Sequence, residues 1–187
     1  ISCTSFFPTK TLGCFGDGGA IFTNNKVIFS KLKSLRLNGK DNNKFKFVGT
    51  NSRLDTLQAT ILLEKLKYFD HETLERRKIA KKYINDLSRY CKTPILSNDY
   101  LNVYSVFTII VKNRKKLISE FNKNQIPYAI YYKKSLHKEP IFKKFNFKDK
   151  DFYNSIQSSK NSISLPIYPG LKKSLQNKII SIIKSQY

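Results

Sequence analysis

The sequence is poor in acidic residues and has neither a methionine nor a long apolar run. Aspartate and glutamate number 13 against 35 lysines and arginines, which gives a formal net charge of +22 at pH 7. No segment approaches the roughly 18 consecutive apolar residues of a membrane helix, and the first residues lack the charged-then-apolar pattern of a secretory signal. We therefore expect no membrane partner and a cytoplasmic location. Since the chain opens on Ile1, we also expect it to be N-terminally incomplete.

Cysteine is also scarce, and its placement excludes two classes of stabilised protein. Cys3, Cys14 and Cys91 are odd in number, far apart and without histidines close by. The sequence therefore indicates neither a disulfide framework nor a zinc cluster. The HETLE string at His71 lacks the second histidine of a zinc protease helix. We expect reduced, buried thiols and no metal.

The excess of positive charge would ordinarily point to nucleic acid or to an anionic membrane surface. Here only six of the 35 basic residues are arginines, and the lysines are scattered along the chain. A nucleic-acid reader gathers arginine and aromatic side chains on one element, whereas this distribution is typical of a solvated surface. We expect no nucleic-acid partner. The competing hypothesis, a basic nucleic-acid-binding module, predicts a steep salt dependence of binding.

Hydrophobic periodicity predicts alternating strands and helices in a chain that is 40% hydrophobic. Strands are predicted over 1–7, 20–23, 100–111 and 127–132, with an extended piece at 164–170. Helices are predicted from Asn24 or Asn25 to Gly39, over 54–90 with a break at 70–73, and over 114–121, 152–162 and 171–185. The polar segment 40–52 is predicted to be a loop. The last half of the chain is expected to form a compact α+β domain.

The stretch SFFPTKTLGCFGDGGAIFTNN, residues 5–25, contains the first candidate site. Pro8 ends the predicted strand just before Lys10, and the glycines that follow allow a tight reversal into the return strand. Lys10 is therefore expected in a loop at a strand end. Such a lysine suits an enzyme that forms a Schiff base, because the amine must be partly desolvated to lose its proton. Taken alone, a single loop lysine is far more often simply solvent-facing.

Four blocks of sequence together resemble one enzyme family. They are SFFPTKTLGCFGDGGAIFTNN, VGTNSRLDTLQATILLEKLK, YAIYYKKSLHKEPIF and SLPIYPGL. In order and approximate spacing they resemble the DegT/DnrJ/EryC1/StrS family of pyridoxal-phosphate-dependent sugar aminotransferases, over essentially the whole chain. The resemblance implies an α/β protein of PLP-dependent transferase fold type I. Residues 1–66 would be the C-terminal part of the cofactor-binding large domain with an interface helix, and residues 67–187 the small C-terminal α+β domain.

The resemblance assigns two residues of the first block to the cofactor. Lys10 matches the lysine that forms the Schiff base with pyridoxal 5'-phosphate and then moves a proton between the substrate carbon and the cofactor. Ser5 matches the serine whose hydroxyl binds the cofactor phosphate, with a plain strand serine as the alternative. Lys10 is thus the expected catalytic residue.

The resemblance also assigns two residues of the second block. Asn51 matches an asparagine that reaches across a homodimer to the phosphate of the partner's cofactor, so a homodimer with shared active sites is implied. Arg53 matches an arginine near the substrate, where a guanidinium can grip a carboxylate or phosphate of a nucleotide sugar. From the residues alone, Arg53 could instead pair with Asp55.

Tyr131 and Tyr132 match the family's pair of ring residues that close over the sugar, and otherwise would be buried strand aromatics. In many relatives the first of the pair is histidine and a proline follows the second, whereas here Lys133 follows. This departure leaves the sugar contacts open. His137 keeps the position of the family's Leu-His pair and is expected to be a satisfied loop histidine.

The activity implied by the resemblance is transfer of an amino group, expected from glutamate, to a keto group of a nucleotide-linked sugar in a ping-pong cycle. The chain looks most like the branch that aminates UDP-linked 3-keto sugars, including the 2-acetamido-3-oxo uronic acid enzymes of bacterial surface-polysaccharide pathways. Family members carry a long N-terminal portion with the aspartate that bonds the pyridine nitrogen, and that portion is missing upstream of Ile1. This chain alone is therefore expected to be inactive or very weak.

Two alternatives within the family stay open. The dehydratases share the fold and cofactor, but a histidine replaces the lysine in that branch, so Lys10 argues against them. The chain could instead be a non-catalytic fragment or a regulatory or binding relative. A complete upstream reading frame that encodes the ring-binding aspartate would discriminate.

Overall fold

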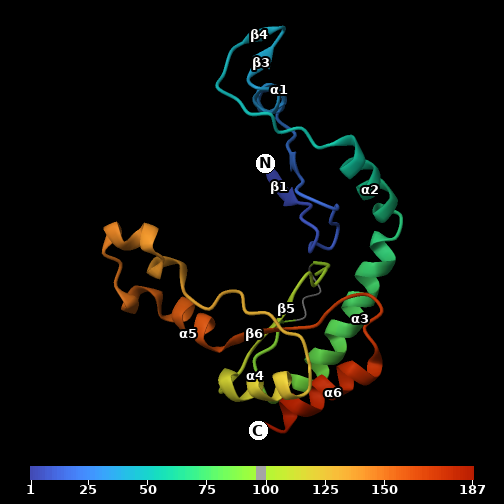
Figure 1. Cartoon of the computed structure of the whole chain (residues 1–187), viewed down its shortest axis with the longest axis vertical. Helices are drawn as coiled ribbons and strands as arrows, with labels where there is room; N and C mark the ends of the chain where they lie inside the picture. Colours follow the sequence, from blue (N-terminus) through green and yellow to red (C-terminus); the bar gives the residue numbers. More distant parts are fainter. Residues whose placement is uncertain (96–99) are drawn as a thin grey trace. The chain divides into compact units, whose positions relative to one another are not determined.

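The computed structural model describes residues 1–95 and 100–187. It divides into two compact units, Ile1–Asp70 (unit 1) and His71–Tyr187 (unit 2). Both units mix helices and strands (Figure 1), so the predicted α/β class is confirmed. Within the described ranges, each helix is too short or too polar to cross a membrane.

Unit 1 begins with the predicted hairpin. Strand β1 (Ser2–Ser5) pairs antiparallel with β2 (Gly19–Phe22), and Ser5 lies opposite Gly19. A Cβ on Gly19 would lie 2.9 Å from the Thr4 carbonyl oxygen, so the absence of a side chain lets the strands meet there. The apolar residues of the segment 1–7 predict a buried strand, and this prediction is wrong, because every residue of β1 is exposed in a sheet of only two strands.

Helix α1 (Lys26–Arg36) starts where the asparagine cap predicted it. The Asn25 side chain accepts hydrogen bonds from the amides of Val27 at 2.9 Å and Ile28 at 3.1 Å. These bonds satisfy two of the amides that the first turn of a helix leaves unpaired. The cap therefore fixes the helix start directly after β2.

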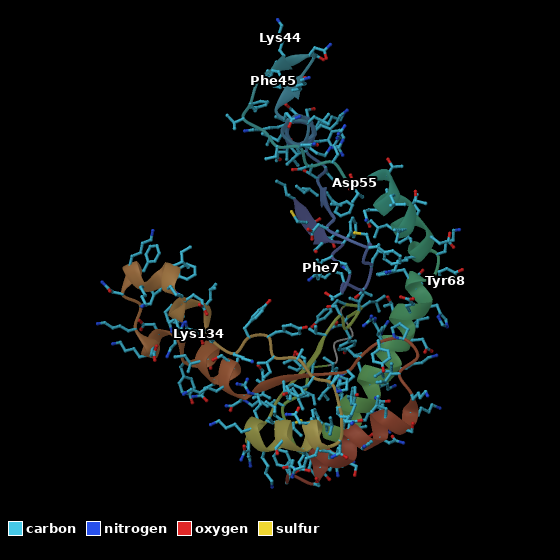
Figure 2. The ribbon with its side chains drawn as sticks, viewed as in Figure 1. Phe7, Lys44, Phe45, Asp55, Tyr68 and Lys134 are labelled. Carbon is cyan, nitrogen blue, oxygen red and sulfur yellow. The ribbon has the colours of Figure 1, made fainter. Side chains whose placement is uncertain are left out.

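The segment after α1 is a hairpin and not the predicted plain loop. Strands β3 (Lys40–Asp41) and β4 (Lys44–Phe45) pair antiparallel, and Figure 2 shows Lys44 and Phe45 projecting from it. Asn42 and Asn43 form the turn with φ of 48° and 61°. Two successive positive φ angles are the geometry that two-residue hairpins favour, and asparagine tolerates them. The paired asparagines were therefore a turn signal within a polar segment.

Two helices occupy the predicted helical stretch. They are α2 (Thr56–Leu66) and α3 (Phe69–Leu87). The break lies at Lys67 and Tyr68, so the predicted break at 70–73 is wrong. The acidic residues of that segment, Asp70 and Glu72, lie inside the first turns of α3, where the helix dipole favours negative charge.

Unit 2 is built on an antiparallel strand pair. Strands β5 (Phe107–Ile110) and β6 (Ser162–Leu165) pair with Phe107 opposite Leu165. Besides α3, which lies almost wholly in this unit, the helices are α4 (Arg114–Lys123), α5 (Tyr153–Asn161) and α6 (Lys173–Lys184), which confirms the three predicted over these residues. Short 3₁₀ helices cover Leu136–Lys138 (η1), Pro140–Phe145 (η2) and Asp149–Phe152 (η3). Helices α4 and α6 lie side by side (Figure 1).

Two predicted strands of unit 2 are shorter than expected. In the segment 100–111 only Phe107–Ile110 is a strand, and Tyr104 interrupts the extended backbone before it with a φ of 45°. In the segment 127–132 only Ala129 pairs, in an isolated bridge with Ser164. Aromatic and β-branched residues misled the prediction because their strand preference reports a fit to a half-buried sheet surface, not a backbone requirement.

One apolar core fills unit 2. Its largest fully buried side chains are Tyr83, Leu87, Phe107, Ile109, Leu117, Phe121, Ile163, Ile179 and Ile183. The Tyr83 ring centroid lies 5.1 Å from that of Phe107, and its hydroxyl donates to the Pro166 carbonyl at 3.1 Å. Burial raises the pKa of Tyr83, so this hydroxyl stays a donor. The core ties α3 to the segment that follows β6.

Candidate active site

Lys10 lies in a turn that closes on itself between β1 and β2. The Cys14 amide donates to the Phe6 carbonyl at 2.8 Å, and the Lys10 amide donates to the Phe7 carbonyl at 2.8 Å. The Cys14 thiol lies 3.0 Å from the Phe6 carbonyl oxygen, as a second donor to it. Figure 2 labels Phe7, where β1 leads into this turn. The Lys10 side chain is exposed, and its predicted position in a loop beyond a strand end is confirmed.

Gly13 allows the turn to close. A Cβ at this position would lie 2.7 Å from the Phe7 carbonyl oxygen and 2.8 Å from that of Pro8. Both atoms belong to the backbone, so a side chain could be accepted only by moving the chain that leads to Lys10. Gly13 is buried against the segment that precedes the lysine. The glycine thus couples the two arms of the turn.

Two residues with hydroxyl groups lie close to Lys10 in the sequence. Ser5, the last residue of β1, accepts a hydrogen bond from the Phe7 amide at 3.2 Å, and its own proton remains available for donation. The Thr11 hydroxyl oxygen is buried and has no hydrogen-bond partner among the residues that the structure describes. Sequence reasoning missed Thr11; the available signal was a hydroxyl next to the candidate lysine.

The cysteines divide by position. Cys14 and Cys91 are buried free thiols, as predicted, whereas Cys3 is exposed. Cys3 lies on the two-stranded sheet of unit 1, which explains the difference. Burial raises the pKa of Cys91 to about 11.

Asn51 and Arg53 meet at a second position in unit 1. They line a surface cavity of about 550 Å³, whose other lining residues are Leu37, Asn38, Lys40, Asn42 and Asn43. Asn51 forms an isolated antiparallel bridge with Leu37. The lining offers a guanidinium, an ammonium and several amides but no carboxylate, so it suits an anionic group.

Arg53 does not form the alternative ion pair with Asp55. Among the ion pairs of residues 1–95 and 100–187, Arg53 and Asp55 do not pair. Asp55 is the cap residue before α2, and its side chain makes no capping hydrogen bond. The Arg53 guanidinium is exposed and free to meet a ligand.

Tyr131 and Tyr132 lie in unit 2, in a turn before η1. They are 53% and 75% exposed, so the alternative of buried strand aromatics is wrong. Their rings meet edge to face with centroids 5.7 Å apart. An exposed aromatic pair of this kind offers apolar ring surface to a ligand.

His137 is held by its neighbours, as expected for a satisfied loop histidine. Its Nε2 lies 3.3 Å from Asp149 Oδ1, and its ring stacks on Phe152 with centroids 4.1 Å apart. Its Nδ1 has no partner among the described residues, so the satisfaction is incomplete. Hydrogen bonds from Lys138 and then His137 hold the pKa of Asp149 below its usual value. The cluster fastens η1 to η3.

The structure therefore groups the predicted residues in three places. Ser5 ends the strand that leads into the turn of Lys10, Asn51 and Arg53 line one cavity, and the two tyrosines share one turn of the other unit. The first group offers an amine and a hydroxyl. The second offers anion-binding donors.

Comparison with known proteins identifies a family that matches this chemistry. Residues 1–184 match the model of the DegT/DnrJ/EryC1/StrS aminotransferase family. The chain is similar to UDP-2-acetamido-2-deoxy-3-oxo-D-glucuronate aminotransferase of Pseudomonas aeruginosa strain PAO1. The two are 40% identical over 142 residues, which cover 75% of this chain and 40% of that protein.

Solved structures agree with the family match. The chain is similar to a DegT DnrJ EryC1 StrS aminotransferase from Brucella abortus, with a TM-score of 0.92, 36% identity, and coverage of 98% of this chain and 50% of that one. It is also similar to NtdA from Bacillus subtilis with bound cofactor PMP, with a TM-score of 0.84, 25% identity, and coverage of 98% and 45%. The predicted fold class is thus confirmed, and the chain spans about half the length of these proteins.

Proposed function

The chain belongs to the DegT/DnrJ/EryC1/StrS aminotransferase family, and from this premise we propose that it is the C-terminal portion of a PLP-dependent aminotransferase that acts on a nucleotide-linked keto sugar. The observation that carries the proposal is the closed turn that presents Lys10, in a chain that matches the family over residues 1–184. Residues 1–66 are proposed as the end of the cofactor-binding domain and residues 67–187 as the small domain.

The turn fits the functional groups of the proposed cofactor, pyridoxal 5'-phosphate. The Lys10 amine can react with an aldehyde, and the Ser5 hydroxyl has a proton to donate to a phosphate. The unpartnered Thr11 hydroxyl would be satisfied by an acceptor oxygen brought to the turn. When bound, the cofactor supplies an aldehyde for the amine and a conjugated ring that withdraws electrons from the substrate carbon.

Lys10 is the proposed catalytic residue. Its Nζ holds the cofactor between turnovers and, once released, moves a proton at the sugar carbon that receives the nitrogen. Hydrogen bonds fix the backbone of the turn from Phe6 to Cys14, which narrows the positions that the amine can reach. Ser5 is the proposed ligand of the cofactor phosphate.

The cavity at Asn51 and Arg53 serves the anionic parts of cofactor and substrate in this proposal. Asn51 binds the cofactor phosphate in the partner's site of a homodimer, and Arg53 binds a phosphate or carboxylate of the nucleotide sugar. The cavity lining of amides, a lysine and an arginine supports both assignments. Tyr131 and Tyr132 close over the sugar, which their exposure permits.

The substrate proposed is a UDP-linked 3-keto sugar, with glutamate as the amino donor. The Pseudomonas relative is named for a UDP-linked 3-oxo-glucuronate, which supports this choice. We further propose that the activity is cytoplasmic and belongs to bacterial surface-polysaccharide or amino-sugar biosynthesis. Because the chain spans half of the Brucella enzyme, we expect the 187 residues alone to be inactive or very weak.

A second candidate is a non-catalytic fragment or a regulatory or binding relative of the family. The half-length coverage favours it, because residues outside this chain would supply the rest of an active site. It differs from the first candidate in predicting no amino transfer even when the chain is joined to the family's N-terminal half.

The deciding experiment joins the chain to that N-terminal half and titrates the protein with pyridoxal phosphate. The proposal predicts an absorbance change that borohydride fixes on Lys10, that Lys10→Ala abolishes, and that accompanies amino transfer to a UDP-linked 3-keto sugar. An absorbance change that is absent, or unaltered by Lys10→Ala, rejects the proposal. Cofactor binding at Lys10 without amino transfer would support the second candidate.

A further inference from the structure

Helix α2 holds the loop that follows Lys10 at two points. The Phe15 amide donates to Gln58 Oε1 at 2.8 Å, and Lys65 Nζ donates to the Gly13 carbonyl at 2.6 Å. Gln58 and Lys65 are seven positions apart, about two helical turns, and so lie on one face of α2. Figure 2 labels Asp55, at the start of this helix, and Phe7, at the start of the turn.

The hydrogen bond from Lys65 to Gly13 affects Lys10 because Gly13 packs directly against the residues that precede Lys10. Gly13 lies so close to the Phe7 and Pro8 carbonyls that a Cβ would overlap both. Those two residues immediately precede Lys10 in the turn, and Gly13 follows it closely. A shift of Gly13 therefore moves one arm of the turn against the other.

Among the described residues, the side chains of Gln58 and Lys65 make their hydrogen bonds to this loop. Lys65 is half-buried and its Nζ also lies 5.6 Å from the centre of the Phe15 ring, whereas Glu64 and Lys67 are exposed and pair with each other. Within the described part of the chain Lys65 has no carboxylate partner. Gln58 packs so closely that a Cβ on Gly16 would lie 3.3 Å from its Nε2.

We infer that Gln58 and Lys65 are positioning residues for Lys10, which fix the turn from which the amine projects. The inference rests on the proposed function for the role of Lys10, but the hold on the turn stands on the contacts alone. Without these ties the loop would sample more conformations, and the amine would spend less time in a productive position.

The first test compares three variants of the full chain by hydrogen exchange and by labelling with pyridoxal phosphate and borohydride. Lys65→Met removes the donor, Lys65→Arg keeps one, and Lys67→Met is the control on the same helix end. Lys65→Met should speed exchange of the Cys14 and Phe15 amides about tenfold, as expected for loss of a charge-assisted hydrogen bond, and lower the share of label on Lys10. Lys65→Arg should restore both readouts.

The second test concerns the other tie. Gln58→Leu removes the acceptor and should speed exchange of the Phe15 amide about fivefold, the size expected for one neutral hydrogen bond. Gln58→Glu keeps an acceptor at the same reach and should preserve the protection. If α2 merely supported the fold, Gln58→Leu and Gln58→Glu would change the exchange of the Phe15 amide by the same factor.

The outcomes separate the two proposals. Exchange and labelling that are the same in Lys65→Met as in Lys67→Met overturn the inference. If the unaltered chain takes no label at Lys10, exchange alone decides whether α2 holds the turn, and the role proposed for Lys10 is decided by labelling of the chain joined to the N-terminal half. Faster exchange with an unchanged share of label on Lys10 overturns the claim that the ties position the amine.

Discussion

The two units differ most in what they bury. In unit 2, α3, the β5–β6 pair, α4 and α6 share a continuous core that includes twenty apolar residues among those the structure describes. In unit 1 the buried hydrophobic residues are Cys14 and Leu62, while Phe15, Val48 and Leu57 are 74%, 99% and 70% exposed. Unit 2 is therefore stabilised by packing, whereas unit 1 depends on backbone hydrogen bonds and a few polar ties.

This difference bears on the candidate site. The turn that presents Lys10 and the cavity at Arg53 both belong to the unit without a substantial core. Exposed apolar side chains in such number mark surfaces that other protein covers. That agrees with a chain that spans half of its structural relatives, and it predicts that the two units respond differently to the same kind of perturbation.

The largest effect should come from the core of unit 2. Phe107→Ala removes a fully buried ring that packs on Tyr83 and should lower the free energy of unfolding by about 3–5 kcal/mol. Leu57→Ala, at a leucine that is 70% exposed in unit 1, should change it by less than about 0.5 kcal/mol. Urea unfolding followed by circular dichroism measures both. Equal losses would contradict the contrast between the units.

The next largest effect comes from alanine substitutions at two glycines, one that is in close contact with the backbone and one that is not. Gly39 and Gly170 have φ of 78° and 79°, but a Cβ on Gly39 would lie 1.8 Å from the Phe47 carbonyl oxygen, whereas Gly170 has nothing within 4 Å. Gly170→Ala should cost about 1–2 kcal/mol from the left-handed conformation alone. Gly39→Ala should in addition disrupt the β3–β4 hairpin, visible as loss of amide protection at Phe47. Unaltered protection would show that the hairpin does not need the glycine.

Alkylation of the buried cysteines measures the local stability of each unit. Cys14 and Cys91 are buried in units 1 and 2 respectively, and burial raises the pKa of Cys91 to about 11, so little reactive thiolate forms at pH 8. We expect Cys3 to be alkylated at once and, as urea is raised, Cys14 well before Cys91. Peptide mapping of the labelled sites gives the order. Reaction of Cys91 before Cys14 would reverse the ranking of the two units.

The smallest effect concerns the exposed carboxyl of Asp149. Hydrogen bonds from Lys138 and His137 lower the pKa of this carboxyl, so its contribution to stability is present above the ordinary aspartate pKa and is lost as pH falls through the lowered value. Asp149→Asn should therefore reduce stability slightly at neutral pH and have a smaller effect at pH 2. Melting temperatures at the two pH values test this. A larger loss at pH 2 would reverse the predicted sign.

Local signals predicted the local structure, and tertiary contacts explain most of what was missed. The cap at Asn25 and the lysine beyond Pro8 follow from one residue each and its neighbours. The ties from Gln58 and Lys65 join positions 43 and 52 residues apart, which no local pattern encodes. Aromatic content likewise predicted a strand at Tyr131, where the chain turns and leaves the ring exposed.

One measurement tests the central claim, that this chain presents Lys10 for covalent attachment of the cofactor. The 187-residue chain is incubated with pyridoxal phosphate, reduced with borohydride and mapped by peptide mass spectrometry. The account predicts a reduced adduct concentrated on Lys10 and lost in Lys10→Ala. No adduct, or label spread evenly over the many surface lysines, would contradict it.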